Sequence, residues 1–305
     1  MSAREARIPQ LITDQTRLLT VRHVTTYTYS EPVRFGEHRM MFRPRESHDL
    51  RLVSTKLEIL PRPSNLRWLH DVFDNSVAIA TFDGASSELH FDSTITLEHR
   101  ETPLPEYALE IGAHTYPFRY SDDERPDLVG ALARQYPSDD VRPWAERFLI
   151  SSSGSTTTMS LLHSMTRGIK EEFEYLRRSE KGVQSPAETL RLRSGSCRDF
   201  AVLMMEAVRS LGLAARFVSG YIFMPNENRR ADDGGGSTHA WMQAYLPGAG
   251  WVDFDPTNSI VGNRNLIRVA VAWDQRNALP LWGTFIGPAS AFRSMQVAVS
   301  VIEEP

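Results

Sequence analysis

The chain has 305 residues, 41% of them apolar and 24% charged, with a formal net charge of −4. These values are ordinary for a globular protein of one large or two smaller domains, and the slightly acidic balance argues against a nucleic-acid partner. No stretch of about 20 apolar residues is present to span a bilayer, and the polar residues 1–7 lack the apolar run of a secretory signal. Together with a single cysteine, these features predict a cytoplasmic protein without a membrane partner.

The first part of the chain is predicted to be β-rich. Short runs rich in Thr, Val, Tyr and other strand-forming residues, without helical spacing, lie at residues 18–29, 51–60, 76–82 and 88–97. Clusters of Pro, Asn, Asp and Gly separate them. Several short strands with regular turn signals predict an antiparallel, sandwich-like domain. We assign it to residues 1–115, with the boundary falling between residues 115 and 155.

The middle of the chain, residues 156–212, is predicted to be helical. Apolar side chains recur every three or four residues from Met159 to Leu176, as on the buried face of a helix. In residues 185–188, Ser-Pro-Ala-Glu, the serine can cap a helix and the glutamate completes a capping box. A further helix is expected from Cys197 to Gly212.

The pattern becomes strand-like again after Gly212. Strands are predicted at residues 215–222, 240–246 and 250–254. The last two are separated by Pro-Gly-Ala, and this short turn predicts a β-hairpin. The segment 225–238 is polar and glycine-rich, and either a lid over a site or an ordinary exposed loop fits it.

Cys197 is the only cysteine in the chain, so it forms no internal disulfide and no cysteine-rich metal site. It follows Gly195-Ser196 at the expected start of a helix. Backbone N–H groups and the positive end of the helix dipole gather there, where they stabilise a thiolate and can bind an oxyanion. A cysteine in that position can act as an acyl-transfer nucleophile if a base reaches it.

His239 and Asp255 are the residues that can supply the base and its orienting group. His239 precedes the first strand of the predicted hairpin and Asp255 ends the second, so antiparallel pairing makes them neighbours. The carboxylate can then hold the imidazole tautomer while the imidazole takes the thiol proton. Asp253 lies on the same strand face and could also orient His239. We favour Asp255, because the strand end is where the hairpin meets the histidine.

Each of these residues also has an ordinary structural interpretation. A lone cysteine is more often a small buried apolar residue than a nucleophile, and an aspartate before proline often only starts a turn. Their combined order and the hairpin geometry favour the functional interpretation. The other eight histidines show no metal-ligand spacing, so neither a metal nor a cofactor is predicted.

Four segments of the second half resemble one family, the bacterial transglutaminase-like superfamily. They are residues 195–201 (GSCRDFA), 215–221 (ARFVSGY), 239–241 (HAW) and 250–258 (GWVDFDPTN). Their order, Cys then His then Asp, is that of the family. The first half is similar to the β-rich domain that precedes the core in two-domain members, with the resemblance carried by residues 23–33, 43–45 and 71–75.

This resemblance implies an α+β, papain-like core over residues 156–305, with helices packed on an antiparallel sheet and a C-terminal closing segment. Within it, Cys197 is expected to be the nucleophile, His239 the general base and then acid, and Asp255 the orienting group. The backbone N–H of Cys197 would supply part of an oxyanion hole, with Tyr175 a candidate second donor. Residues 273–277 depart from the family's usual pattern in the closing segment.

The expected activity is cysteine-dependent acyl transfer at an amide or peptide bond through a thioester. Hydrolysis by a protease or amidase is favoured, because nothing in the sequence reserves a site for an amine or excludes water. Protein-glutamine amine transfer uses the same residues and is an alternative. So is a catalytically silent binding module, although such members usually lose one of the three side chains. The N-terminal domain is expected to pack against the core, with recruitment of a protein partner as a second role.

Overall fold

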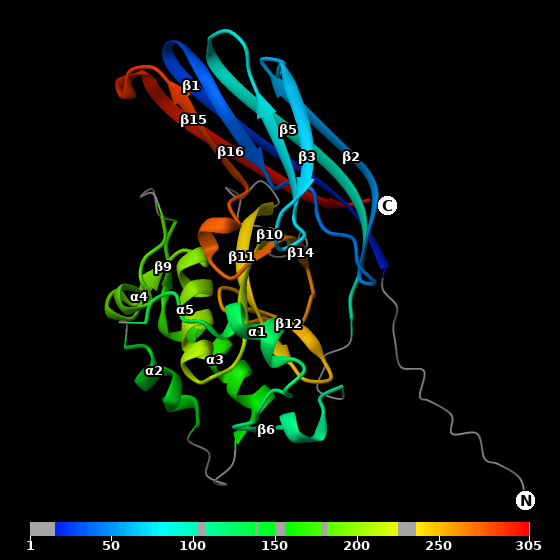
Figure 1. The fold of residues 1–305 in the computed structure, drawn as a ribbon, viewed down its shortest axis with the longest axis vertical. Helices are drawn as coiled ribbons and strands as arrows, with labels where there is room; N and C mark the ends of the chain where they lie inside the picture. The colour runs from blue at the N-terminus through cyan, green and yellow to red at the C-terminus, as the bar shows by residue number, and fades with distance from the viewer. Residues whose placement is uncertain are drawn as a thin grey trace, which may run out of the picture.

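The computed structural model describes residues 16–102, 108–137, 140–149, 156–177, 182–224 and 236–304. A large curled β-sheet forms one end of the molecule and a mixed helical and β unit forms the other (Figure 1). The α+β class predicted from the sequence is confirmed.

The long strand β1 organises the first sheet. Its first half pairs with β5 and β16, and its second half pairs with β4 and β15. Strand β2 pairs with β5 and strand β3 with β4. The bounds are β1 Thr16–Met40, β2 Leu50–Leu60, β3 Asn65–His70, β4 Ser76–Thr81, β5 Ser86–Arg100, β15 Leu281–Ile286 and β16 Phe292–Glu303.

The two halves of this sheet enclose a shared apolar core, which makes the domain sandwich-like as predicted. The pairing of β1 with β5 shifts register between Thr28 and Val33, where Pro32 interrupts the ladder. Beyond that point the strand continues into the second half of the sheet. The enclosed side chains include Tyr29, Phe35, Ile59, Ala80, Leu89 and Phe91.

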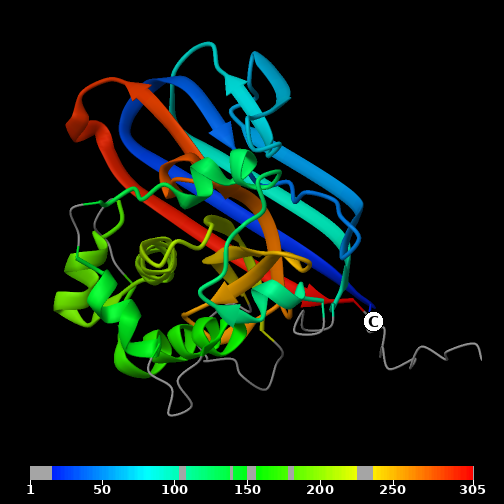
Figure 2. The same ribbon diagram turned by 60° about the horizontal axis from the view of Figure 1, so that its bottom comes forward.

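The C-terminal segment belongs to this sheet. The sequence-based assignment placed residues 281–303 with the core, but β15 and β16 hydrogen-bond to β1 over most of their lengths. Figure 2 shows β16, in red, running beside β1, in blue. This part of the assignment is therefore corrected, because partners about 240–285 residues apart leave no local sequence signal. The boundary proposed between residues 115 and 155 stays a prediction.

The second unit packs helices on a five-stranded antiparallel sheet with the order β13-β12-β11-β10-β14. Its main helices are α3 Thr158–Glu172, α4 Pro186–Leu192 and α5 Cys197–Ser210. Its strands are β10 Ala215–Phe223, β11 Gly236–Leu246, β12 Gly250–Asp255, β13 Ile260–Val261 and β14 Leu266–Ala272. The predicted helices and the β11–β12 hairpin are all present, and Ser185 caps α4 as expected.

Short elements complete the second unit. They are α1 Arg125–Leu132, α2 Arg142–Glu146, the paired strands β6 Thr115–Tyr116 and β7 Thr156–Thr157, and the paired strands β8 Glu174–Tyr175 and β9 Ser194–Gly195. Single 3-10 turns lie at Ile111–Ala113, Arg147–Leu149, Gln275–Asn277 and Ala289–Ala291.

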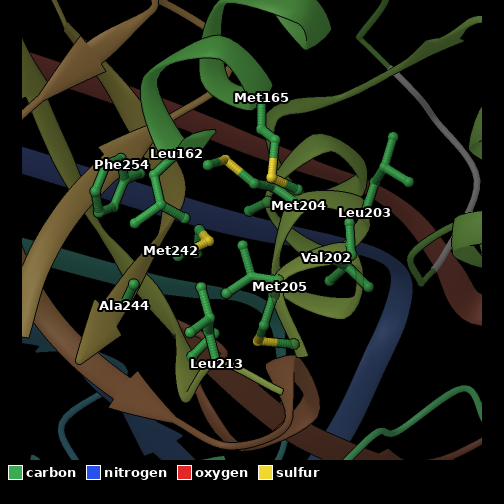
Figure 3. Packing of buried hydrophobic residues seen from close by; sticks show 14 of the residues in the cluster. Leu162, Met165, Val202, Leu203, Met204, Met205, Leu213, Met242, Ala244 and Phe254 are labelled. Carbon is green, nitrogen blue, oxygen red and sulfur yellow. The ribbon is translucent and has the colours of Figure 1, made fainter. Parts of the chain in front are cut away.

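Helix α5 is the central helix of this unit. Every residue from Asp199 to Ser210 is buried, so the helix is enclosed on all sides rather than on one face. Figure 3 shows Met204 and Met205 of α5 among side chains from α3 and from the sheet, including Met165 and Phe254. This packing fixes the helix axis, and with it the position of Cys197 at the helix N-terminus.

The two units share a buried interface with both apolar and polar contacts. Leu19 and Ile95 of the first sheet pack against Tyr221 and Ile267 of the second. At the same interface, Nδ1 of His23 lies 3.0 Å from the hydroxyl oxygen of Tyr221. A buried and hydrogen-bonded interface of this kind holds the two sheets in a fixed relation.

A second polar contact comes from the turn before β4. The side-chain amide of Asn75 donates to the carbonyl oxygen of Val271 at 2.8 Å and accepts from its N–H at 2.9 Å. The ring of His99 lies 3.1 Å from the carbonyl oxygen of Leu266. Both contacts reach backbone groups of β14, the edge strand of the second sheet. Side chains of the first unit thus contact backbone groups at that edge.

Candidate active site

The start of α5 is held by the buried carboxylate of Asp199. One oxygen of this carboxylate accepts from the N–H and the hydroxyl of Ser196, each at 2.8 Å. The other accepts from the N–H of Gln184 at 2.7 Å. Cys197 is the first helical residue, and its side chain is partly exposed. The structure therefore places the thiol at a fixed helix N-terminus that solvent can reach, as the sequence predicted.

Gly195 is required by the same cluster. A Cβ atom at this position would lie 2.9 Å from Cβ of Asp199 and 3.2 Å from Oε1 of Gln184. The space beside Gly195 is thus filled by these two side chains. The glycine therefore serves the packing of the helix cap.

Tyr175 lies close in space to the N-terminus of α5. It pairs with Gly195 in the two-residue ladder of β8 and β9, and its side chain is 46% exposed. Its ring lies 6.5 Å from the ring of Phe200, the fourth residue of α5. The expected role of Tyr175 as a second oxyanion donor stays a prediction.

His239 is buried on β11 and faces Asp255. Its Nε2 lies 2.8 Å from Oδ2 of the carboxylate, so Nδ1 is the ring nitrogen that remains for the thiol. Burial alone would lower the pKa of His239. The Asp255 carboxylate and a side-chain hydrogen bond with Cys197 outweigh burial and raise that pKa to about 10. These two interactions therefore favour the charged form of the imidazole.

Asp255 is fixed by the turn that follows it. Its Oδ1 accepts from the N–H of Thr257 at 2.9 Å, and its Oδ2 accepts from Nδ2 of Asn258 at 2.8 Å. Burial opposes ionisation, but the contacts with His239, Asn258 and Thr257 together hold the pKa of Asp255 below its usual value. The carboxylate is therefore ionised while it orients the imidazole.

Asn258 was missed as a site residue in the sequence. Its Nδ2 lies 3.3 Å from Nε2 of His239 as well as 2.8 Å from Asp255. The signal that could have found it is the run Asp-Pro-Thr-Asn, because aspartate at the first position of such a turn accepts from the residues that follow. Because Nε2 already donates to Asp255, Asn258 supports the carboxylate directly and the histidine only through it.

The choice between Asp253 and Asp255 is resolved by geometry. Oδ1 of Asp253 accepts from Nε1 of Trp241 at 2.6 Å, and its Oδ2 lies 3.4 Å from Nη1 of Arg268. The Trp241 ring stacks on the ring of His239 with centroids 5.8 Å apart. Asp255 is thus the carboxylate that binds His239, as expected, whereas Asp253 supports it through the tryptophan.

Three further expectations from the sequence concern a loop, a metal site and a membrane span. Of the segment 225–238, residues 225–235 are outside the described residues. Within the described residues, no group of three or more His, Cys, Asp or Glu side chains is arranged to hold a metal ion. None of the helices in the described ranges is both long and apolar enough to cross a membrane.

Relatives with similar sequences extend over most of the chain. An uncharacterised protein of Mycobacterium tuberculosis is 29% identical over 281 residues, which is 86% of each chain. An uncharacterised protein of Mycobacterium leprae is 23% identical over 273 residues, covering 88% of this chain and 93% of the relative. The two-part organisation is therefore not peculiar to this chain.

A solved structure shows the same fold. A candidate cysteine protease from Cytophaga hutchinsonii superposes with a TM-score of 0.69 at 20% identity, covering 95% of this chain and 92% of that one. Two family models also match, in the order in which the two units occur. Residues 19–98 match the bacterial transglutaminase-like N-terminal region, and residues 144–256, which include Cys197, His239 and Asp255, match the transglutaminase-like superfamily. The chain belongs to the transglutaminase-like superfamily, with a bacterial N-terminal region ahead of a papain-like core.

Proposed function

We propose that this protein is a cysteine-dependent enzyme that cleaves an amide or peptide bond through a thioester on Cys197. The observation that carries the proposal is the buried His239–Asp255 pair, in which Nε2 lies 2.8 Å from Oδ2 and the charged form of the imidazole is favoured. A charged imidazole next to a sulfur at a helix N-terminus favours the thiolate, which is the reactive form.

In the first half of the reaction, the sulfur attacks the carbonyl carbon of the substrate. The negative charge that develops on the carbonyl oxygen is stabilised by the N–H of Cys197, which has no partner within the helix. The C–N bond then breaks, and the His239 imidazolium gives its proton to the leaving amine. The product is a thioester on Cys197 and a neutral imidazole.

In the second half, the imidazole removes a proton from water, and the resulting hydroxide attacks the thioester. The C–S bond breaks, the acid product leaves and the thiolate–imidazolium pair is restored. Hydrolysis is our proposal because the Cys197 side chain is partly exposed, so water can reach the thioester. The substrate is then a peptide or another amide. The cytoplasmic location stays a prediction.

The activated thiol can be tested by alkylation. Native protein is treated with iodoacetamide near neutral pH, and modification of Cys197 is followed by mass spectrometry. We expect fast labelling that falls more than about tenfold in His239→Ala, because the imidazolium no longer stabilises the thiolate. His70→Ala is the matched control, since that side chain is 71% exposed and far along the chain from the site. Slow labelling that does not depend on His239 would favour a binding module without catalysis.

The fate of the thioester can be tested by product analysis. A glutamine-containing peptide is incubated with the protein, with and without a primary amine, and the products are separated by mass. Deamidation or backbone cleavage in both samples supports hydrolysis. An amine adduct that replaces the hydrolysis product would instead assign amine transfer, and the absence of any product with Cys197→Ala confirms that the cysteine is required.

A further inference from the structure

A cavity of about 790 Å³ lies where the first unit meets the second sheet. The segment 45–49, which follows β1, forms one wall. The opposite wall consists of side chains from four strands of the second sheet, namely Arg216, Gln243, Trp251, Asp253 and Arg268. Its volume is within the range of about 300–1,000 Å³ that is typical of small-molecule sites.

Most charged groups in this cavity satisfy one another. Arg268 donates to Oδ1 of Asp49 at 3.1 Å and lies 3.4 Å from Oδ2 of Asp253. Asp49 also accepts from the side-chain amide of Asn263 at 3.1 Å. These three charged side chains are each at most 17% exposed, and the two carboxylates outnumber the one guanidinium. Together they form a closed cluster that needs no further ligand.

Arg216 is different from this cluster. Its Nε donates to Oε1 of Gln243 at 2.8 Å, and its guanidinium carbon lies 4.1 Å from the centre of the Trp251 ring. Both partners are uncharged, and no carboxylate of the described residues lies within 4 Å of it. Burial, and then repulsion by Arg268, lower the pKa of Arg216 to about 9, although the Asp253 carboxylate in the same cavity acts in the opposite direction. A partly buried cation whose direct contacts are all with neutral groups is costly, and an anion that binds it directly would reduce that cost.

We propose that Arg216 is the anchor of a binding site for an oxyanion, either the carboxylate or the phosphate of a small molecule. Because Nε is used by Gln243, the two terminal nitrogens are the ones left to donate, and their parallel N–H groups match two oxygens of such a group. The Trp251 ring holds the guanidinium plane in position. The rest of the ligand occupies the cavity.

This site is separate from the proposed active site. The indole of Trp241, which is fully buried, lies between them: its Nε1 binds Asp253 on the cavity side and its ring stacks on His239. The proposal therefore does not depend on the catalytic role of Cys197, and its test needs no activity measurement.

The stability of the protein without ligand distinguishes a ligand site from a structural arginine. Arg216→Gln removes the charge and retains a polar side chain. If Arg216 serves a ligand, thermal unfolding in an anion-poor buffer will show a Tm that is unchanged or higher in the variant, because a costly buried charge has been removed. If Arg216 is structural, the loss of its contacts with Gln243 and Trp251 will lower the Tm, and the proposal is wrong.

Anion binding is then measured directly. The probes are sodium phosphate and sodium citrate at constant ionic strength, followed by Tm and by isothermal titration calorimetry. We expect a saturable rise in Tm for the native protein and for Arg276→Gln, which makes the same charge change at a side chain that is 79% exposed. Arg216→Gln should lose that rise and Arg216→Lys should weaken it, because lysine lacks the planar fork. A response to citrate alone assigns a carboxylate ligand, and a response to phosphate alone assigns a phosphate. No saturable response, or an equal one in Arg216→Gln, overturns the proposal.

Discussion

Asp253 and Asp255 lie on the same face of β12 and bind neighbouring side chains of β11. Asp253 accepts from Nε1 of Trp241 at 2.6 Å, and Asp255 lies 2.8 Å from Nε2 of His239. Their environments shift their pKa values in opposite directions: burial raises that of Asp253, whereas His239 and the following turn outweigh burial and lower that of Asp255. The two carboxylates therefore have different tasks: Asp253 holds the Trp241 side chain in place, and the charge of Asp255 stabilises the charged form of His239.

The first prediction compares the matched substitutions Asp255→Asn and Asp253→Asn. Removing the charge at Asp255 should lower the pKa of His239, because that carboxylate is the main group stabilising the imidazolium. We expect amide-cleaving activity to fall by at least about 100-fold, as the imidazole loses its charge and its fixed orientation. Asp253→Asn retains an acceptor for Trp241, so it should cost much less activity.

The titration of His239 is the direct measurement of this difference. With histidine labelled for NMR, the ring of His239 should remain protonated well above pH 7 in the native protein and in Asp253→Asn. In Asp255→Asn it should titrate at a lower pH. Equal titration in all three proteins would mean that Asp255 does not hold the charge of the imidazole.

A second prediction concerns acid pH and the interface between the two units. Burial lowers the pKa of His23 to about 4, from about 6.5 in an unfolded chain. The unfolded state therefore binds the proton first, so stability is full above pH 6.5 and falls as the pH drops from 6.5 towards 4. A shift of this size corresponds to about 3 kcal/mol. Urea unfolding at pH 7.5 and 4.5 should show a smaller loss in His23→Gln than in the native protein.

The exposed His70 provides the control for this acid effect. Because His70→Gln removes a side chain that is 71% exposed, its loss of stability between pH 7.5 and 4.5 should match that of the native protein. If the His23 and His70 variants behave alike, His23 is not the source of the acid sensitivity.

A third prediction concerns the helix cap below the nucleophile. Asp199→Ala removes the acceptor for the N–H groups of Ser196 and Gln184, and we expect it to cost about 1–3 kcal/mol of unfolding free energy. The first turn of α5 should also loosen, so iodoacetamide labelling of Cys197 should change in rate. Asp199→Asn keeps one carbonyl oxygen and should lie between the two proteins. A native unfolding curve for Asp199→Ala would show that the cap is dispensable.

A fourth prediction concerns Gly220, which pairs with His239 across β10 and β11. A Cβ atom here would lie 2.1 Å from the carbonyl oxygen of Ile267 and 2.8 Å from the Trp241 ring. Gly220→Ala should therefore destabilise the protein by about 1–3 kcal/mol and disturb the stacking of Trp241 on His239. Gly112→Ala is the control, because a Cβ there meets nothing within 4 Å, and its urea midpoint should not change.

The core and its site could be predicted because their signals are local. The cap at Ser185, the start of α5 at Cys197 and the β11–β12 hairpin each depend on residues a few positions apart. The hairpin alone brings His239 and Asp255 together, so the geometry of that pair follows from one turn. The catalytic roles of these residues are a proposal that awaits the tests above.

The features that could not be predicted depend on residues far apart in the chain. The pairing of β15 and β16 with β1 joins segments about 240–285 residues apart, and the alternation of apolar residues along a strand does not indicate which strand it pairs with. The contact of Asp199 with the N–H of Gln184, and the crowding around Gly195, likewise arise only when α4 and α5 meet.

The return of β16 to β1 has a consequence for how the protein is made. Strand β1 leaves the ribosome long before β16, the neighbour that covers one side of its first half. The helices and the second sheet lie between β1 and β16 in the sequence, so they can fold before β16 emerges, because domains form during synthesis as their residues emerge. Until residues 292–303 emerge, β1 presents an open row of N–H and C=O groups to other nascent chains, so a chaperone that shields this edge should matter most in the interval between the synthesis of β1 and that of β16.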